Sequence, residues 1–192
     1  HKEYRRQRQM CIRDRRDATM LMAELGLRPV ELLHLKAKTD ELTGEPYWWC
    51  SYQKKGGNGA TQPRRIHPLP LVDSDGQVQR WNLIERWRAG LITLPSLESG
   101  NGAGECWKVY FNRRAYWLSL KAQMLKMEDK RLTSYSFRHS YSLRGTRRGI
   151  DTGSMAAAMG HNLQTHCQSY PWAEAKSTAQ AFAAAAERLA AV

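Results

Sequence analysis

Three short segments of this chain carry arginine, histidine and tyrosine at positions that could act together on a phosphodiester. They are GLRPVELLHLK (26–36), YSFRHSYS (135–142) and MGHNLQTHCQSY (159–170). Reaction at the phosphorus of a phosphodiester builds negative charge on its non-bridging oxygens, so fixed cations must be aimed there. Arginine suits this role, because its planar fork binds two oxygens and keeps its proton. Arg28 and Arg138 are therefore the candidate phosphate ligands.

Tyr170 is the candidate nucleophile, and it follows His161 by nine residues. A phenol with a pKa of ~10 becomes reactive only beside cations or a proton acceptor. On one straight helix a spacing of nine places two side chains on opposite faces, so the chain must break between them. Gly160 can end one helix and Asn162 can cap the next. This pattern predicts that His161 lies on a connecting turn, where it can donate to a phosphate oxygen or carry the tyrosine proton.

The three segments, with a lysine-bearing hairpin between the first and the second, resemble the motifs of the tyrosine recombinase (phage integrase) family. Those motifs are GLR-x-x-E-L-x-x-L, a hairpin lysine, H-x-L-R-H, and L-G-H with a tyrosine nine residues later. The resemblance covers roughly residues 18–172. It implies an α+β, mostly helical catalytic domain with a small antiparallel sheet. It also implies an enzyme that cuts and rejoins DNA through a 3′-phosphotyrosine at Tyr170.

The resemblance further implies a lysine general acid at the end of the second β-strand, which protonates the leaving 5′ oxygen. Lys54 and Lys55 both fit this position, and Lys54 is slightly favoured because the strand register is open. The other lysine is then a DNA-backbone contact or a solvated side chain. Arg64 and Arg65, on the far side of the hairpin tip, are predicted to bind DNA.

The sequence departs from the family at Tyr135, where the motif usually has histidine. A phenol can donate a hydrogen bond but cannot carry positive charge. Positions i and i+3 share a helix face, so Tyr135 and Arg138 can still point at one phosphate. Two further residues are given supporting roles: Glu31 is expected to orient Arg28, and His139 matches a largely structural histidine.

The elements that must position these side chains follow from apolar spacing and from Gly, Pro and Asn signals. The Gly/Ser/Pro-rich stretch 91–105 is predicted to be an irregular loop, and 177–191 is Ala-rich with high helix propensity. A β-hairpin with a long tip is predicted from 47–53 and 65–72. Helices are predicted over 17–25, 29–36, 111–127, 137–148, 152–159 and 163–169.

Composition narrows the partners of the chain. Lys and Arg number 30 against 18 Asp and Glu among 192 residues, and the net charge of +12 favours a polyanion such as double-stranded DNA. The four cysteines are far apart, which favours neither a zinc cluster nor a disulfide framework. His161, His166 and Cys167 lie close together in sequence but form a weak zinc pattern. No metal, nucleotide or other cofactor is expected.

The chain is interpreted as one catalytic domain over 17–192. Residues 1–16 include RQMCIRDR, which looks like a translated sequencing adapter, so this segment is interpreted as a possible artefact. The N-terminal DNA-clamping domain usual in the family is expected to be absent. A cytoplasmic protein that does not enter a membrane and that forms a synaptic homo-tetramer on DNA is expected.

Two other functions stay open on the sequence. One is a recombinase-derived DNA-binding protein that no longer cuts, which Tyr135 favours. The other is a type IB topoisomerase, which would use the same Arg, Lys, His and Tyr chemistry without a second DNA site. The spacing of nine residues between His161 and Tyr170 favours the integrases.

Overall fold

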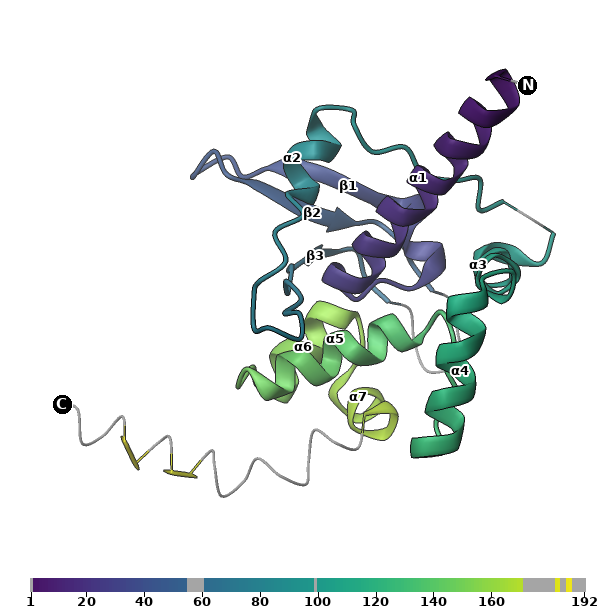
Figure 1. Cartoon of the computed structure of the whole chain (residues 1–192). Helices are drawn as coiled ribbons and strands as arrows, with labels where there is room; N and C mark the ends of the chain where they lie inside the picture. The colour runs from purple at the N-terminus through teal and green to yellow at the C-terminus, as the bar shows by residue number, and fades with distance from the viewer. Residues whose placement is uncertain (1, 55–60, 99, 171–181, 184–185, 188–192) are drawn as a thin grey trace.

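The protein combines a small antiparallel sheet with a larger set of helices, as the computed structural model shows for residues 2–54, 61–98, 100–170, 182–183 and 186–187 (Figure 1). Helices make up most of the described chain, which confirms the predicted α+β, mostly helical class. The elements are α1 (Lys2–Leu25), the 3₁₀ helix η1 (Pro29–His34), β1 (Leu35–Thr39), β2 (Pro46–Cys50), β3 (Arg64–Ile66), α2 (Leu83–Arg88), α3 (Gly102–Asn112), α4 (Ala115–Glu128), α5 (Ser136–Arg147), α6 (Thr152–Met159) and α7 (Leu163–Ser169).

The end of α1 and η1 lie between the sheet and the last three helices. In Figure 1 the sheet and α2 occupy the upper part of the molecule, and α5, α6 and α7 occupy the lower part. Helix α1 packs against α5, and α6 contacts both β3 and α7. Residues at the α1–η1 junction therefore face residues of α5, β3 and the α6–α7 turn.

Two apolar clusters hold this arrangement together, because burying apolar surface is the main favourable term in folding. The larger cluster joins α1, η1, the sheet, α2 and α3, and includes Leu21, Trp48, Ile66, Leu83 and Trp107. The smaller cluster lies under the last helices. Its buried members are Tyr141, Met155, Met159 and Tyr170.

The sheet has the order β1-β2-β3, and both pairs of strands are antiparallel. Arg64 lies opposite Cys50, and Ile66 lies opposite Trp48. Because alternate residues of a strand point to opposite faces, Arg64 shares the inner face with Ile66, and Arg65 points outward. The register therefore places the side chains of Arg64 and Arg65 on opposite faces of the sheet.

The first strand was not expected from the sequence. Residues 29–36 were predicted to form one helix, whereas η1 ends at His34 and the chain continues as β1. A tight turn after β1, in which Gly44 has φ +71° and its N–H donates to Asp40 O, returns the chain into β2. Pairing of β1 with β2 thus outweighs the helical pattern of the apolar residues. The other predicted strand, 65–72, is shorter than expected and ends at Ile66 before Pro68 and Pro70, which lack the N–H that a ladder needs.

The helical predictions hold best between residues 136 and 169. The bounds predicted for α6 and α7 are confirmed, and those for α5 differ by one residue at each end. Helix α1 begins at Lys2, not at residue 17, and the short helix α2 was missed. The Ala-rich stretch 177–191 lies largely outside the described residues.

The predicted helix 111–127 is two helices, and α3 also takes up the end of the predicted loop 91–105. Helix α3 ends at Asn112 and α4 begins at Ala115. The bend between them lets Trp117 stack on Phe111, with ring centroids 4.4 Å apart. This aromatic packing favours a break between α3 and α4, and the local sequence alone does not predict it.

Candidate catalytic site

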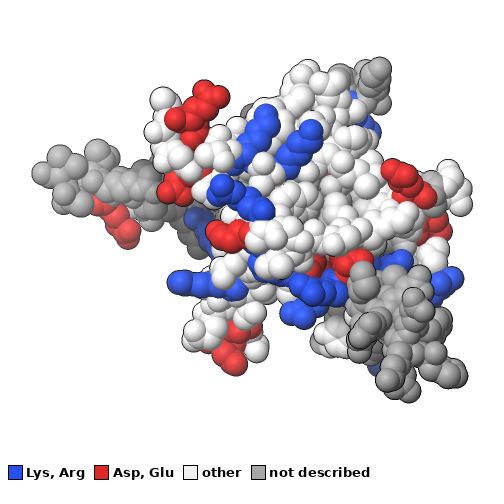
Figure 2. Space-filling view, turned by 90° about the horizontal axis from the view of Figure 1, so that it is seen from above, with Lys and Arg blue, Asp and Glu red and all other residues white. Residues whose placement is uncertain are grey.

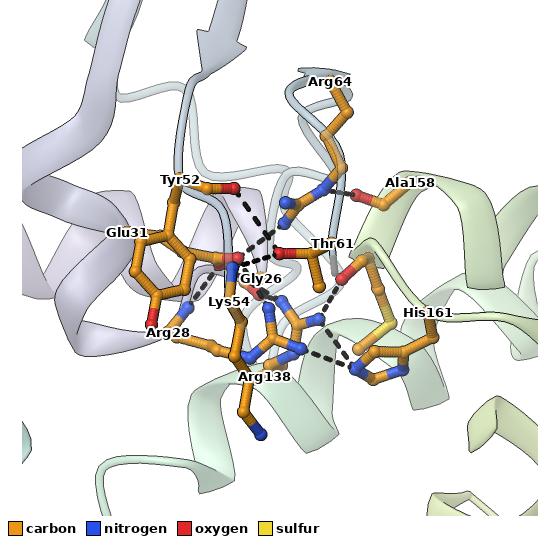
Figure 3. Close-up of polar contacts among 11 residues, drawn as sticks. Gly26, Arg28, Glu31, Tyr52, Lys54, Thr61, Arg64, Arg138, Ala158 and His161 are labelled. Carbon is orange, nitrogen blue, oxygen red and sulfur yellow. Dashed lines mark hydrogen bonds and ion pairs between the residues drawn. The ribbon is translucent and has the colours of Figure 1, made fainter. Parts of the chain in front are cut away.

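Glu31 lies at the centre of a cluster of three guanidinium groups (Figure 3). Its side chain is fully buried on η1. Oε1 accepts from Arg28 Nη1 at 2.7 Å and from Arg64 Nη2 at 2.9 Å, and Oε2 lies 3.4 Å from Arg138 Nη1. Burial raises the pKa of Glu31, but Arg138, Arg64 and Arg28 together outweigh it and hold the pKa below its usual value. Glu31 is therefore a carboxylate at neutral pH and fixes the three arginines.

The α1–η1 junction positions Arg28. Gly26 ends α1 with φ +64°, and a Cβ at this position would lie 2.4 Å from the ring of Tyr141, so only glycine fits. Arg28 is extended, with φ −69° and ψ 150°, and the following Pro29 starts η1. The backbone N–H of Arg28 donates to Glu31 Oε2 at 2.8 Å, which fixes the turn from both sides.

Arg138 enters the cluster from α5 and is almost completely buried, with 1% of its surface exposed. Its Nη1 donates to Gly26 O at 2.7 Å, and its Nη2 donates to Met159 O. Burial lowers the pKa of Arg138 to about 10, although Glu31 raises it, so the group keeps its charge at neutral pH. Arg138 thus connects α5 to the α1–η1 junction and to the end of α6.

His161 lies on the turn between α6 and α7, as the spacing argument predicted. Gly160 ends α6 in the left-handed conformation with φ +63°. Asn162 caps α7, and its side chain accepts from the Thr165 N–H at 2.7 Å. The turn directs the imidazole of His161 toward Arg28 and Arg138, the two predicted phosphate ligands (Figure 3).

The contacts of His161 define its tautomer. Nε2 lies 2.9 Å from Arg28 Nη2 and 3.1 Å from Arg138 Nη2. Guanidinium groups only donate, so Nε2 is the acceptor and the proton is on Nδ1. Burial, followed by the charges of Arg138 and Arg28, lowers the pKa of His161 to about 3. The imidazole is neutral, and its Nδ1 has no hydrogen-bond partner among the described residues.

Tyr170 follows α7 directly and packs on this turn. Its ring stacks on the ring of His161, with centroids 5.9 Å apart and an interplanar angle of 19°. Only 3% of Tyr170 is exposed. Burial raises the pKa of Tyr170 above its usual value, against the charge and a side-chain hydrogen bond of Arg138. The phenol therefore keeps its proton at neutral pH and touches the same arginine that contacts His161.

Two predicted residues lie at the edge of this group. Lys54 is exposed, and its backbone N–H donates to Thr61 Oγ1 at 2.7 Å. Its side chain extends from the first part of the β2–β3 connection past the arginine cluster in Figure 3. Lys55 lies outside the described residues. Tyr135 directly precedes α5 and is 46% exposed. The Tyr135 phenol thus lies at the N-terminal end of the helix that carries Arg138.

Arg64 and Arg65 have different environments, although the sequence placed both at a DNA-binding surface. Only 10% of the Arg64 side chain is exposed; its Nη2 donates to Glu31, and its Nε donates to Ala158 O at 2.9 Å. It is therefore a third guanidinium of the buried cluster, because it shares the inner face of β3 with Ile66. Arg65 is half-exposed on the outer face, 3.3 Å from Asp40 and over the ring of Tyr47.

The structure surrounds Tyr170 with three imidazoles, of which the sequence gave functional roles to two. The His166 ring is 4.7 Å from the Tyr170 ring between centroids, and the His139 ring is 5.2 Å away. His166 had been considered only as a weak zinc ligand. The overlooked signal is its spacing: residues i and i+4 of a helix lie on one face, which is the relationship of His166 to Tyr170.

Among the residues that the structure describes, no group of three His, Cys, Asp or Glu side chains is arranged to hold a metal ion. Within the same residues no helix is long and apolar enough to cross a membrane. On the face shown in Figure 2, Lys and Arg side chains form several groups with Asp and Glu near them, and they do not make one continuous patch. Below the surface, three arginines converge on Glu31.

Comparison with known proteins gives a limited result. No model of a protein family matches the sequence, and no curated protein matches it. The structure resembles that of the Tn1549 transposon integrase in complex with circular intermediate DNA, with a TM-score of 0.45 and 18% identity over 90% of this chain and 59% of that chain. A second structure of that integrase, in complex with transposon right end DNA, gives a TM-score of 0.45 and 18% identity over 91% of this chain and 58% of that chain. The chain thus spans less than two thirds of the length of these integrase chains.

Proposed function

We propose that this chain carries the catalytic domain of a tyrosine recombinase, with Tyr170 as the nucleophile. One observation supports this proposal above the others. Arg28 and Arg138, from distant parts of the chain, both end at Nε2 of His161, whose ring stacks on Tyr170. Two fixed guanidinium groups beside a phenol are what attack on a phosphodiester needs.

The proposed reaction is an exchange of one phosphodiester for another. The phosphate binds to the guanidinium groups of Arg28 and Arg138, which Glu31 orients. The Tyr170 hydroxyl gives its proton to a neighbouring imidazole as its oxygen attacks phosphorus. A bond forms between that oxygen and phosphorus, and the bond from phosphorus to the 5′ oxygen breaks. Lys54, or Lys55 in its place, gives its proton to the leaving 5′ oxygen. The 3′-phosphotyrosyl bond keeps the energy for rejoining, so the reaction needs no nucleotide.

The partners follow from this reaction. Double-stranded DNA is the substrate, and recombination joins two DNA sites, so a synaptic homo-tetramer is the expected assembly. Metal ions are not required, because arginines bind the phosphate oxygens. A cytoplasmic enzyme of DNA integration, acting for a mobile element, fits this activity.

A DNA-binding protein that no longer cuts is the second candidate. It is favoured by Tyr135, which replaces the expected imidazole, and by the deep burial of Tyr170. Such a protein would bind DNA with the salt dependence of phosphate contacts but form no covalent bond.

One assay separates the two candidates without knowledge of the target sequence. The chain is incubated in excess EDTA with a pool of randomised duplexes, each nicked so that cleavage releases a short fragment. We expect an SDS-stable adduct to a DNA 3′ end, and its loss in Tyr170→Phe, because only that hydroxyl attacks. An adduct that persists in Tyr170→Phe assigns the nucleophile to another residue. DNA binding without an adduct in the parent protein supports the second candidate.

A further inference from the structure

His166 is a completely buried imidazole whose two ring nitrogens make no hydrogen bond to the part of the chain that the structure describes. It lies on α7, and none of its surface is exposed. A buried donor or acceptor without a partner costs roughly 1 to 3 kcal/mol. Folding alone therefore does not explain an imidazole at this position, since an apolar side chain would avoid the cost.

The surroundings of His166 indicate what its nitrogens serve. Its ring is 4.7 Å from the ring of Tyr170 and 5.9 Å from the ring of His161, between centroids. The N–H of Tyr170 donates to the backbone oxygen of His166 at 2.9 Å, so both residues belong to one turn of chain. Any shift of α7 that brings Tyr170 onto a phosphate moves His166 with it.

The neighbouring imidazole cannot accept a proton at the same time. The only lone pair of neutral His161 is at Nε2, which already accepts from Arg28 and Arg138. Protonation of that nitrogen would break both contacts and add a charge beside two guanidinium groups. His139 is further from Tyr170 and is exposed to water.

We propose that His166 is a catalytic residue, the general base that accepts the proton of the Tyr170 hydroxyl during attack on the phosphodiester. The proposal rests on the proposed function. As the bond from the Tyr170 oxygen to phosphorus forms, the phenolic proton moves to a ring nitrogen of His166, which becomes an imidazolium. The bond to the 5′ oxygen breaks and that oxygen takes a proton from Lys54. Rejoining reverses each transfer, so the protein is unchanged after both steps.

The surroundings of His166 keep its imidazole neutral, so that it can accept a proton. Burial and the charge of Arg138 lower the pKa of His166, so its ring is neutral at physiological pH. The other titratable groups around it are His161 and Tyr170, whose rings face its own ring, and His139, whose ring contacts Tyr170. Both imidazoles have lowered pKa values and are neutral, so Arg138 is the charge that acts on His166.

The test uses a duplex whose 3′ phosphate carries a p-nitrophenyl group. Nitrophenolate leaves without a proton, so the rate of adduct formation depends on activation of Tyr170 and not on the general acid. His166→Asn keeps a polar side chain that does not titrate, and Gln164→Ala on the exposed face of α7 is the control. General-base catalysis contributes ~100-fold to 10,000-fold. We expect His166→Asn to form the adduct at least ~10-fold more slowly and to lose the fall in rate that the parent shows on the acid side.

Each result decides the matter. An unchanged rate in His166→Asn overturns the role of His166 and leaves the proposed function intact. If His166→Asn forms the adduct more slowly but its rate still falls in acid as the parent's does, the effect is structural. That result also overturns the role of His166 as general base. A parent rate that does not fall in acid overturns it independently of any variant, which covers the case in which His166→Asn does not fold. A parent that forms no adduct on the nitrophenyl or the natural substrate rejects the proposed function itself.

Discussion

Arg28 and Glu31 hold each other through two hydrogen bonds, one from the backbone and one from the side chain. The Arg28 N–H donates to Oε2 at 2.8 Å and Nη1 donates to Oε1 at 2.7 Å. Glu31 also contacts Arg64 and Arg138. One buried carboxylate thus neutralises part of three positive charges.

Loss of this carboxylate should destabilise the domain strongly. Removing one partner of a buried ion pair commonly costs about 3 to 5 kcal/mol, and Glu31→Ala would leave three arginines close together. The free energy of unfolding in urea measures this. Glu105→Gln is the matched control, because its pair with Lys108 is exposed and is expected to contribute less than about 1 kcal/mol. Similar losses in the two variants would contradict the central role of Glu31.

Acid should destabilise the protein through His161. The folded pKa of about 3 is below the unfolded value of ~6.5, so the unfolded chain binds the extra proton. The stabilisation is therefore complete above pH ~6.5 and is lost as the pH falls toward 3. His161→Gln removes this titration, so its unfolding free energy should change less between pH 6.5 and 4 than that of the parent. Parallel curves for the two proteins would show that His161 titrates normally.

Tyr135 should contribute a hydrogen bond to cleavage. One donor to the reacting phosphate is commonly worth ~100-fold to 1000-fold in rate, so Tyr135→Phe should slow adduct formation by at least ~10-fold. Tyr135→His should keep or raise the rate and add a pH dependence near ~6.5. Single-turnover rates on the nicked duplex measure both. A Phe variant as fast as the parent would make Tyr135 a packing residue.

Lys54 should matter only when the leaving group needs a proton. We expect Lys54→Ala to slow cleavage of natural DNA by ~100-fold or more and to recover most of that loss on the p-nitrophenyl substrate. Lys38→Ala, which removes an equally charged side chain from β1, is the control for general DNA affinity. An equal loss on both substrates would indicate that Lys54 binds the DNA backbone and that Lys55 is the acid.

The sequence predicted those parts of the site whose backbone conformation depends on neighbouring residues alone. The turn that carries His161 follows from Gly160 and Asn162, whose backbone and capping roles depend on near neighbours alone. Arg28 follows in the same way from Gly26 and Pro29.

The parts that were missed depend on packing between distant segments. The first two residues of β1, Leu35 and Lys36, were predicted as the end of a helix, and their strand conformation depends on pairing with β2. The inward direction of Arg64 requires the register against Cys50, which the sequence does not contain. The burial of His166 depends on the packing of α7 against α6 and of its ring on Tyr170.

The packing of Tyr170 limits which substitutions at this position leave the protein folded. The ring belongs to a buried cluster with Tyr141, Met155 and Met159, so its removal would leave a cavity. Truncation of a buried aromatic ring to alanine typically costs about 3 to 5 kcal/mol, whereas loss of the hydroxyl alone keeps the ring in place. Under the proposed function, a gene copy selected only for a folded, DNA-binding protein is therefore expected to lose cleavage through Phe at position 170. Variants with a small residue at position 170 would misfold, so selection would remove them whatever their effect on recombination.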